Sequence, residues 1–341
     1  MAKIEFVKDI IKSEFLSPLK NFGQDSQAIE RRKDPLTDGW CRINVNRPKR
    51  FVQAEKIKIK PDKKCFFCPK NVEVTTSKFL PSLIPEGRIK VNEFILFPNL
   101  FPFGKYHAVG VLTKKHSLQL HEITPEMWRD CLTGSIKFFK SVNEKDSKAR
   151  FPSINFNYSH SAGASILHPH VQVLLDLLPT VMTDKYYRKS WEYFDKNKTN
   201  YWQNLISQER NGERFVGENN SMAWLTGFAP ICNDETIGIM KGNVSSFFEL
   251  NEKQISDLSE GIHKIFNGLY KVKGVTSANM TVFSAPLDER LGNFFSLNVK
   301  IISRPSDKAY TSDRAFCEII HREPVISGIP EELAKDLRKV F

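Results

Sequence analysis

Two stretches of the chain repeat one order of strand-like and helix-like patterns, and this constrains the fold more than any other feature. The first stretch reads "YHAVGVLTKKH", "TPEMWRDCLTGSIKFFKSV", "SINFNYS" and "HPHVQVLLDL". The second reads "ETIGIMKG", "NEKQISDLSEGIHKIFNGLY", "SANMTVFSAP" and "FFSLNVKIISRP". Thr124 precedes His168 by almost the same distance as Asn251 precedes Phe294. We therefore predict an α+β fold with two duplicated halves, in which antiparallel sheets are flanked by helices.

The duplication divides the chain into residues 1–185, which hold most histidines, and residues 186–341. The spacing places Phe294, Ser296 and Asn298 where the first half has His168, His170 and Gln172. Because the second half lacks the histidines, we expect one active site per chain.

Capping residues mark where the two long helices begin. Thr124 precedes Pro125, a residue that is favoured at the first helical position. Asn251 is followed three residues later by Gln254, which is the spacing of a capping box. Near the amino terminus, apolar residues fall near helical spacing, and Pro18 stands close to their end. That pattern predicts a short amphipathic helix before Pro18.

Composition narrows the class of protein. The 341 residues are 40% hydrophobic, which is enough for one large core or two smaller ones. No signal peptide or membrane span is apparent, so we expect a cytoplasmic protein. The six cysteines are scattered apart from one C-x-x-C, which favours thiols or metal ligands over disulfides. The net charge of +11 is spread along the chain, which favours a solvated surface or small anionic ligands over nucleic acid.

The segment "NYSHSAGASILHPHVQVLLDL" is the strongest candidate for chemistry. Successive side chains of a strand alternate between faces, so His168, His170 and Gln172 share one face. Pro169 favours a position for His168 at the start of the strand. The small residues of "SAGAS" let backbone amides approach an anion. A histidine there can attack phosphorus as a nucleophile, with Gln172 donating to a phosphoryl oxygen. The alternative is that these histidines only form structural hydrogen bonds, as a single strand histidine more often does.

The pair Cys65 and Cys68 has the spacing of two ligands to one tetrahedral ion. Two further ligands must come from elsewhere in the chain. We favour His116 and His168, and the spacing does not exclude His107 and His121. The favoured set is a Cys₂His₂ zinc site made of Cys65, Cys68, His116 and His168. The alternative is a pair of free thiols in a core.

Taken together, these motifs resemble those of the galactose-1-phosphate uridylyltransferase family, the transferase branch of the histidine-triad superfamily. The stretches "DPLTDGWCRINVNRPKR", "CFFCPKN", "KHSLQL", "NFNYSHSAGAS" and "HPHVQ" occur in the family's order. The resemblance implies a ping-pong nucleotidyl transfer, zinc on the same four ligands and a homodimer. It also implies a closing helix in "REPVISGIPEELAKDL".

The resemblance also assigns roles to individual residues. It makes His170 the nucleophile and Gln172 the residue that stabilises its adduct. The residues implied to bind substrate are Arg47 and Arg50 near the phosphates, Asn157, Gly163 and Ser165 at the phosphoryl groups, and Asn92 and Glu93 near the nucleoside.

Three departures from the family separate the possible functions. The second half lacks a histidine cluster, so we expect no second metal. The family's hexose-contacting segment is only loosely matched by "SDRAFCEIIH". Val171 stands where the family often has a smaller residue. The loose match at the hexose segment argues against specificity for galactose. From the resemblance as a whole, we expect transfer of a nucleoside monophosphate, such as UMP from UDP-glucose, to a hexose 1-phosphate. The alternatives are a phosphorylase of nucleotide sugars or dinucleoside polyphosphates that uses inorganic phosphate, and an inactive nucleotide- or nucleic-acid-binding protein.

Overall fold

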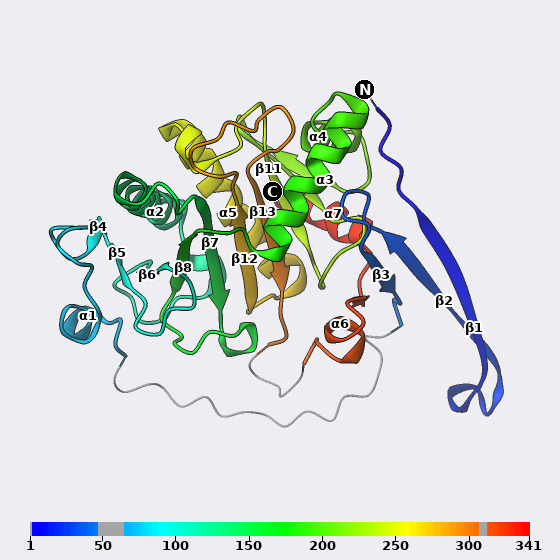
Figure 1. Cartoon of the computed structure of the whole chain (residues 1–341). Helices are drawn as coiled ribbons and strands as arrows, with labels where there is room; N and C mark the ends of the chain where they lie inside the picture. Colours follow the sequence, from blue (N-terminus) through cyan, green and yellow to red (C-terminus); the bar gives the residue numbers. More distant parts are fainter. Residues whose placement is uncertain (1, 47–64, 307–311) are drawn as a thin grey trace.

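The computed structural model describes residues 2–46, 65–306 and 312–341 (Figure 1). Ten strands form one antiparallel sheet in the spatial order β4-β5-β6-β8-β7-β12-β13-β11-β10-β9. Their bounds are β4 Ile89–Val91, β5 Phe94–Pro98, β6 Tyr106–Val111, β7 Phe151–Tyr158, β8 His170–Asp176, β9 Phe215–Glu218, β10 Met222–Thr226, β11 Thr236–Met240, β12 Ala278–Phe283 and β13 Asn298–Ser303. A second sheet has the order β1-β2-β3-β14, with bounds β1 Lys8–Ser17, β2 Gly23–Lys33, β3 Trp40–Ile43 and β14 Val325–Ile326.

The ten-stranded sheet has the duplicated arrangement that the sequence predicts. Its order is symmetric about the central pair β7 and β12, so that β8 corresponds to β13, β6 to β11, β5 to β10 and β4 to β9. The fold class is therefore confirmed, with both halves sharing one sheet. The division at residues 185 and 186 stays a prediction.

The residue-by-residue match between the halves differs from the one that spacing suggests. The backbone N–H of Leu112 donates to Pro169, and that of Met240 donates to Leu297, at the starts of β8 and β13. This register makes Ser296, Asn298 and Lys300 the counterparts of His168, His170 and Gln172. The earlier match of Phe294 to His168 is wrong by two residues, because the spacing from the N-caps was matched only approximately and α5, with 22 residues, is one longer than α2, with 21.

The helices in the described residues have the bounds α1 Pro69–Thr75, α2 Pro125–Lys145, α3 Val181–Asn197, α4 Tyr201–Glu209, α5 Glu252–Lys273, α6 Phe316–Ile319 and α7 Pro330–Arg338. The hydroxyl of Thr124 accepts from the backbone of Met127, and Asn251 forms a capping box with Gln254, so both predicted caps are confirmed. The expected closing helix is α7. None of these helices is both long and apolar enough to cross a membrane.

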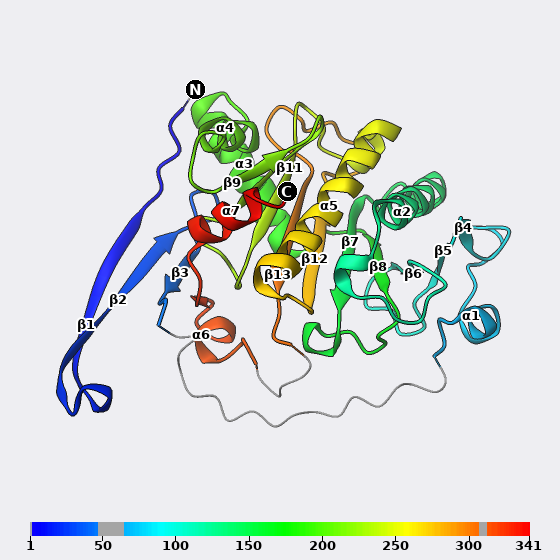
Figure 2. The ribbon, with the colours of Figure 1, turned by 180° about the vertical axis from the view of Figure 1, so that it is seen from behind.

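The main core lies between one face of the sheet and the neighbouring helices α2 and α5 (Figure 2). In the first half, Phe94 fills the space between Gly110 of β6 and Gly134 of α2, where a Cβ would lie 2.5 Å from its ring. The second half repeats this packing with Trp224, Gly238 and Gly261. Both helix glycines lie ten residues after their N-caps, which supports the duplication.

The opposite face of the sheet is covered differently in the two halves. Over β10, β11 and β12, aromatic residues of α3 and α4 form a second core that includes Tyr186 and Trp202. Over β5 and β6, the segment that contains Cys65, Phe67 and α1 forms a smaller cluster. Between these clusters, β7 and β8 present polar side chains that include His170 and Asn155.

The predicted amino-terminal helix is wrong, because this segment is the strand β1. All ten residues of β1 pair with β2, in a ribbon that projects from the body of the molecule (Figure 1). Residues Lys8 to Leu16 are exposed. Their apolar spacing therefore reflects no buried helix face, and Pro18 begins the turn of the hairpin.

Candidate active site

Four predicted metal ligands come together where β8 begins. One ligand atom from each of Cys65, Cys68, His116 and His168 lies within 4.8 Å of all the others, and these four make the one such cluster found among the described residues. The Cys65 sulfur lies 3.6 Å from His168 Nδ1, and the Cys68 sulfur lies 3.4 Å from His116 Nδ1. The structure thus brings together the favoured set of ligands.

The geometry of this cluster fits a tetrahedral ion. Zinc–sulfur and zinc–nitrogen bonds at the tetrahedral angle separate S from N by about 3.6 Å. His168 Nε2 donates to the backbone carbonyl of Thr113 at 2.7 Å, which leaves a lone pair on Nδ1 facing the thiols. The backbone N–H of Phe67 points at the Cys65 sulfur, as suits a thiolate. Burial raises the pKa of Cys65, and the neighbouring Cys68 thiol acts in the same direction.

His107 and His121, which the spacing also allows, have other surroundings. His107 contacts Gln172, and His121 stacks on Tyr270 with ring centroids 3.7 Å apart. If zinc is bound, Cys65, Cys68, His116 and His168 are the residues that would hold it. An ion held there would tie the segment before α1 to the start of β8.

His170 is the first residue of β8 and is 7% exposed. Its Nδ1 lies 2.8 Å from the backbone carbonyl of His168. Because a carbonyl only accepts, Nδ1 carries the proton and Nε2 carries the lone pair. The Phe67 ring packs edge-on against the imidazole at 5.2 Å. Burial lowers the pKa of His170, and its neighbour Val171 turns into the core on the other face.

Gln172 lies on the same face as His170 and is held by a residue from the next strand. His107 Nε2 lies 2.9 Å from Gln172 Oε1. The backbone N–H of Phe103 points at His107 Nδ1, so the proton of this ring belongs on Nε2 and donates to Gln172. The Asn99 amide nitrogen also lies 3.1 Å from this Nε2, and because both atoms carry protons in this tautomer they form no hydrogen bond. With its oxygen engaged, Gln172 has its amide N–H groups left to donate.

The residues that the resemblance assigns to phosphoryl groups lie beside β8 on the neighbouring strand and loop. Asn157 is near the end of β7, and its Oδ1 accepts a 2.7 Å hydrogen bond from Asn279 of β12. Gly163 follows a short 3₁₀ turn, His160–Ala162, and its φ of +92° requires a glycine-like backbone. Both Gly163 and Ser165 are exposed, which leaves this loop accessible.

Asn92 and Glu93 form the turn between β4 and β5. Asn92 donates to Asp130 of α2, and the Glu93 carboxylate accepts from the Thr113 hydroxyl at 2.9 Å and from the Lys114 backbone. Thr113 also holds His168, so Glu93 supports the metal cluster through that residue. These bonds lower the pKa of Glu93.

Arg47 and Arg50 lie outside the described residues. The sequence did not identify His107, Asn155 or Asn279 as parts of this face. His107 was considered only as a metal ligand, and Asn279 belongs to the other half. The register of the strands brings His107 and Asn279 to the site, and no local sequence motif marks either residue.

Comparison with known proteins places this arrangement in context. No family model matches the chain. An uncharacterized protein of Archaeoglobus fulgidus is 31% identical over 93% of this chain and 94% of its own length. Galactose-1-phosphate uridylyltransferase of Schizosaccharomyces pombe is 26% identical, with 68% and 72% covered. ADP-glucose phosphorylase of Arabidopsis thaliana is 23% identical, with 77% and 80% covered.

A solved structure has the same fold. The crystal structure of an ADP-glucose phosphorylase from Arabidopsis thaliana with bound ADP-glucose superimposes with a TM-score of 0.75. It is 20% identical, and the match covers 92% of this chain and 99% of the other. With the sequence relatives and the duplicated sheet, these findings show that the chain belongs to the galactose-1-phosphate uridylyltransferase family of the histidine-triad superfamily.

Proposed function

We propose that the protein transfers a nucleoside monophosphate from a nucleotide sugar to a phosphate-bearing acceptor through a covalent adduct on His170. The Nε2 lone pair attacks the α-phosphorus, a P–N bond forms, and the bond to the bridging oxygen breaks to release a sugar 1-phosphate. An oxygen of the acceptor phosphate then attacks the same phosphorus. The P–N bond breaks, and the neutral imidazole is restored.

One observation carries this proposal, and it is the orientation of His170. The His168 carbonyl fixes the proton on Nδ1, so the nucleophilic nitrogen is Nε2 without any prior proton transfer. Gln172, on the same face, is positioned by His107 to donate to a phosphoryl oxygen as charge develops there. The zinc ligand His168 is two residues away, so the proposed ion anchors the backbone that holds this ring.

The leading acceptor is a hexose 1-phosphate and the leading donor is UDP-glucose, in line with the yeast relative. A second candidate is a phosphorylase that uses inorganic phosphate. The Arabidopsis relative supports it, and so does the segment loosely matched to the family's hexose contacts. In that segment, Asp313 pairs with Arg304 of the protein itself, with Nη2 to Oδ1 at 2.8 Å.

The experiment begins with the protein and a nucleotide sugar labelled at the α-phosphate, without acceptor. UDP-glucose and ADP-glucose are tested in parallel, and acid-labile, base-stable label on the protein is measured. We expect one of them to label the chain at up to one nucleotide per site. Hexose 1-phosphate or inorganic phosphate is then added, and the acceptor that discharges the label identifies the reaction.

The outcomes separate the candidate functions. Discharge by a hexose 1-phosphate supports a transferase, whereas discharge by phosphate alone supports a phosphorylase. If the protein binds nucleotides but takes up no label from any nucleotide sugar, the adduct mechanism is wrong and a binding function remains. Nucleic-acid binding would be recognised by its steep loss with added salt.

A further inference from the structure

The two halves meet at β7 and β12, and a polar network crosses this junction beside the phosphoryl-binding residues. In the register of these strands, Asn157 lies opposite Asn279. Asn279 Nδ2 donates to Asn157 Oδ1 at 2.7 Å and to the carbonyl of Ala162 at 2.8 Å. A single amide of the second half thus contacts both Asn157 and the loop that leads to Gly163.

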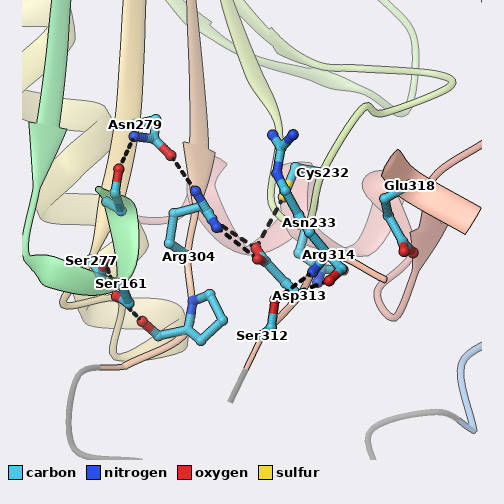
Figure 3. A network of polar contacts seen from close by, with 12 residues as sticks. Ser161, Cys232, Asn233, Ser277, Asn279, Arg304, Ser312, Asp313, Arg314 and Glu318 are labelled. Carbon is cyan, nitrogen blue, oxygen red and sulfur yellow. Dashed lines mark hydrogen bonds and ion pairs between the residues drawn. The ribbon is translucent and has the colours of Figure 1, made fainter. Parts of the chain in front are cut away.

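The orientation of the Asn279 amide is fixed by charged residues behind it (Figure 3). Arg304 Nη1 donates to Asn279 Oδ1 at 2.9 Å. Arg304 is itself held by Asp313 through two hydrogen bonds of 2.8 Å, and both side chains are largely buried. Since an arginine only donates, the Asn279 atom that faces it must be the oxygen.

The orientation of the Asn279 amide therefore determines that of the Asn157 amide. With its Oδ1 turned to Arg304, Asn279 donates from Nδ2 to Asn157, which must accept with its own Oδ1. The Nδ2 of Asn157 is then the group that remains to donate. A donor suits the oxygens of a phosphoryl group, whereas an amide turned the other way would present an acceptor to them.

We propose that Arg304, Asp313 and Asn279 form a positioning relay that fixes Asn157 as a hydrogen-bond donor to the α-phosphate. Arg304, Asp313 and Asn279 act through Asn157 and do not touch the reacting atoms. The inference rests on the proposed function, because it takes Asn157 to bind phosphate. It gives the half without the histidine motif a role in the reaction.

A second link across the same junction holds the loop itself. Ser161 Oγ lies 2.7 Å from Ser277 Oγ and also contacts the carbonyl of Pro305. The backbone N–H of Arg304 donates to the Ser277 carbonyl at 2.9 Å. The strand ends that carry Asn279 and Arg304 are thus fastened to the loop between β7 and β8 (Figure 3).

Asn279→Asp tests the relay directly. The carboxylate keeps a partner for Arg304 but only accepts, so Asn157 must turn its donor away from the phosphate. We expect the affinity for UMP or AMP, whichever nucleoside monophosphate the wild type binds, to fall about 10- to 100-fold by calorimetry. Arg304→Gln removes one of the two groups that orient the Asn279 amide and leaves the other, the Ala162 carbonyl, so it should give a smaller loss. Asn197→Asp is the matched control, because it makes the same charge change on α3 and should bind like the wild type.

A double-mutant cycle with Asn157→Ala separates the relay from general damage. In the Asn157→Ala background, Asn279→Asp should cause less than about a twofold further loss, because its effect passes through Asn157. Wild-type affinity in Asn279→Asp, or an equal loss in both backgrounds, would overturn the relay. A wild-type protein that binds the nucleotide but forms no adduct would refute the proposed function alone, since the relay is read out by binding.

Discussion

The two halves of the sheet use the same backbone frame for different purposes. At the start of β8, the His170 ring donates to the carbonyl of His168, two residues earlier, at 2.8 Å. At the start of β13, the Asn298 amide donates to the carbonyl of Ser296, again two residues earlier, at 2.9 Å. The local bond is retained, whereas the imidazole is found in one half only.

The two halves also differ in the pair of side chains that links β6 to β8 and, in the second half, the start of β11 to β13. In the first half, His107 of β6 lies 2.9 Å from Gln172, a pair of neutral side chains. The corresponding residues of the second half are Glu235 and Lys300, which form an ion pair of 3.0 Å. Burial disfavours the charge of Lys300, yet the Glu235 carboxylate raises its pKa above the usual value.

What covers the sheet explains this division. Ser296, the counterpart of the proposed metal ligand His168, accepts from Asn200 and from Gln203 of α4. The helices α3 and α4 thus seal the second half with side chains of the protein itself. The start of β13 is thus closed by α4, whereas the start of β8 is covered by the segment that holds Cys65 and Phe67.

We expect the largest effect on adduct formation when His170 is replaced by asparagine, the residue at the corresponding position of the second half. His170→Asn keeps a side-chain donor for the His168 carbonyl but removes the nucleophile. Adduct formation should fall at least about 10⁴-fold, because removing a nucleophile removes the covalent step. Incorporation of label from the nucleotide sugar measures this change, and thermal unfolding should show that the fold persists.

The reciprocal change, Asn298→His, provides the control for that comparison. The covered strand start should take up no label when His170→Asn is also present. Labelling of the double variant would contradict the view that α3 and α4 close the second half.

Removal of a predicted zinc ligand should give the next largest effect. Cys68→Ser should lower the metal content from about one zinc per chain to nearly none, because three ligands bind the ion far more weakly than four. Elemental analysis after dialysis measures this. Cys317→Ser is the matched control, since Cys317 is also partly exposed and lies outside the cluster. Equal zinc in Cys68→Ser and the wild type would contradict the assigned site.

Much of the fold and the metal cluster could be predicted because their signals are local. Thr124 and Asn251 cap their helices through the next three residues, and the spacing of Cys65 and Cys68 directly suits two ligands on one ion. The strand alternation correctly placed His170 and Gln172 on one face.

The contacts that orient the site could not be predicted in this way. His107 meets Gln172, and Asn279 meets Asn157, only because particular strands pair in a particular register. Pairing of residues far apart in sequence is set by the whole sheet, and one residue of slip would reverse every face. The amino-terminal strand was missed for a related reason, since β1 is defined by its partner β2.

The ion pair of the second half should matter for stability more than for chemistry. Glu235→Gln removes the carboxylate that pairs with Lys300, in a site where the side chains of Glu235 and Lys300 are 2% and 12% exposed. The free energy of unfolding should fall by about 3 kcal/mol, as for other buried pairs that lose one partner. Denaturant unfolding measures this loss. Glu235→Leu with Lys300→Met should recover most of it, and a loss below about 1 kcal/mol in Glu235→Gln would show that the pair contributes little.

The smallest effect is expected at the matching pair of the first half. His107→Leu removes the donor that holds Gln172, so the rate of adduct formation should fall about tenfold, the equivalent of one hydrogen bond. His107→Gln can place an N–H near the position of Nε2 and should restore most of the rate. The comparison is made on folded protein with nucleotide sugar at saturation, so that the rate and the affinity are separated. If His107→Gln is as slow as His107→Leu, the hydrogen bond does not position Gln172.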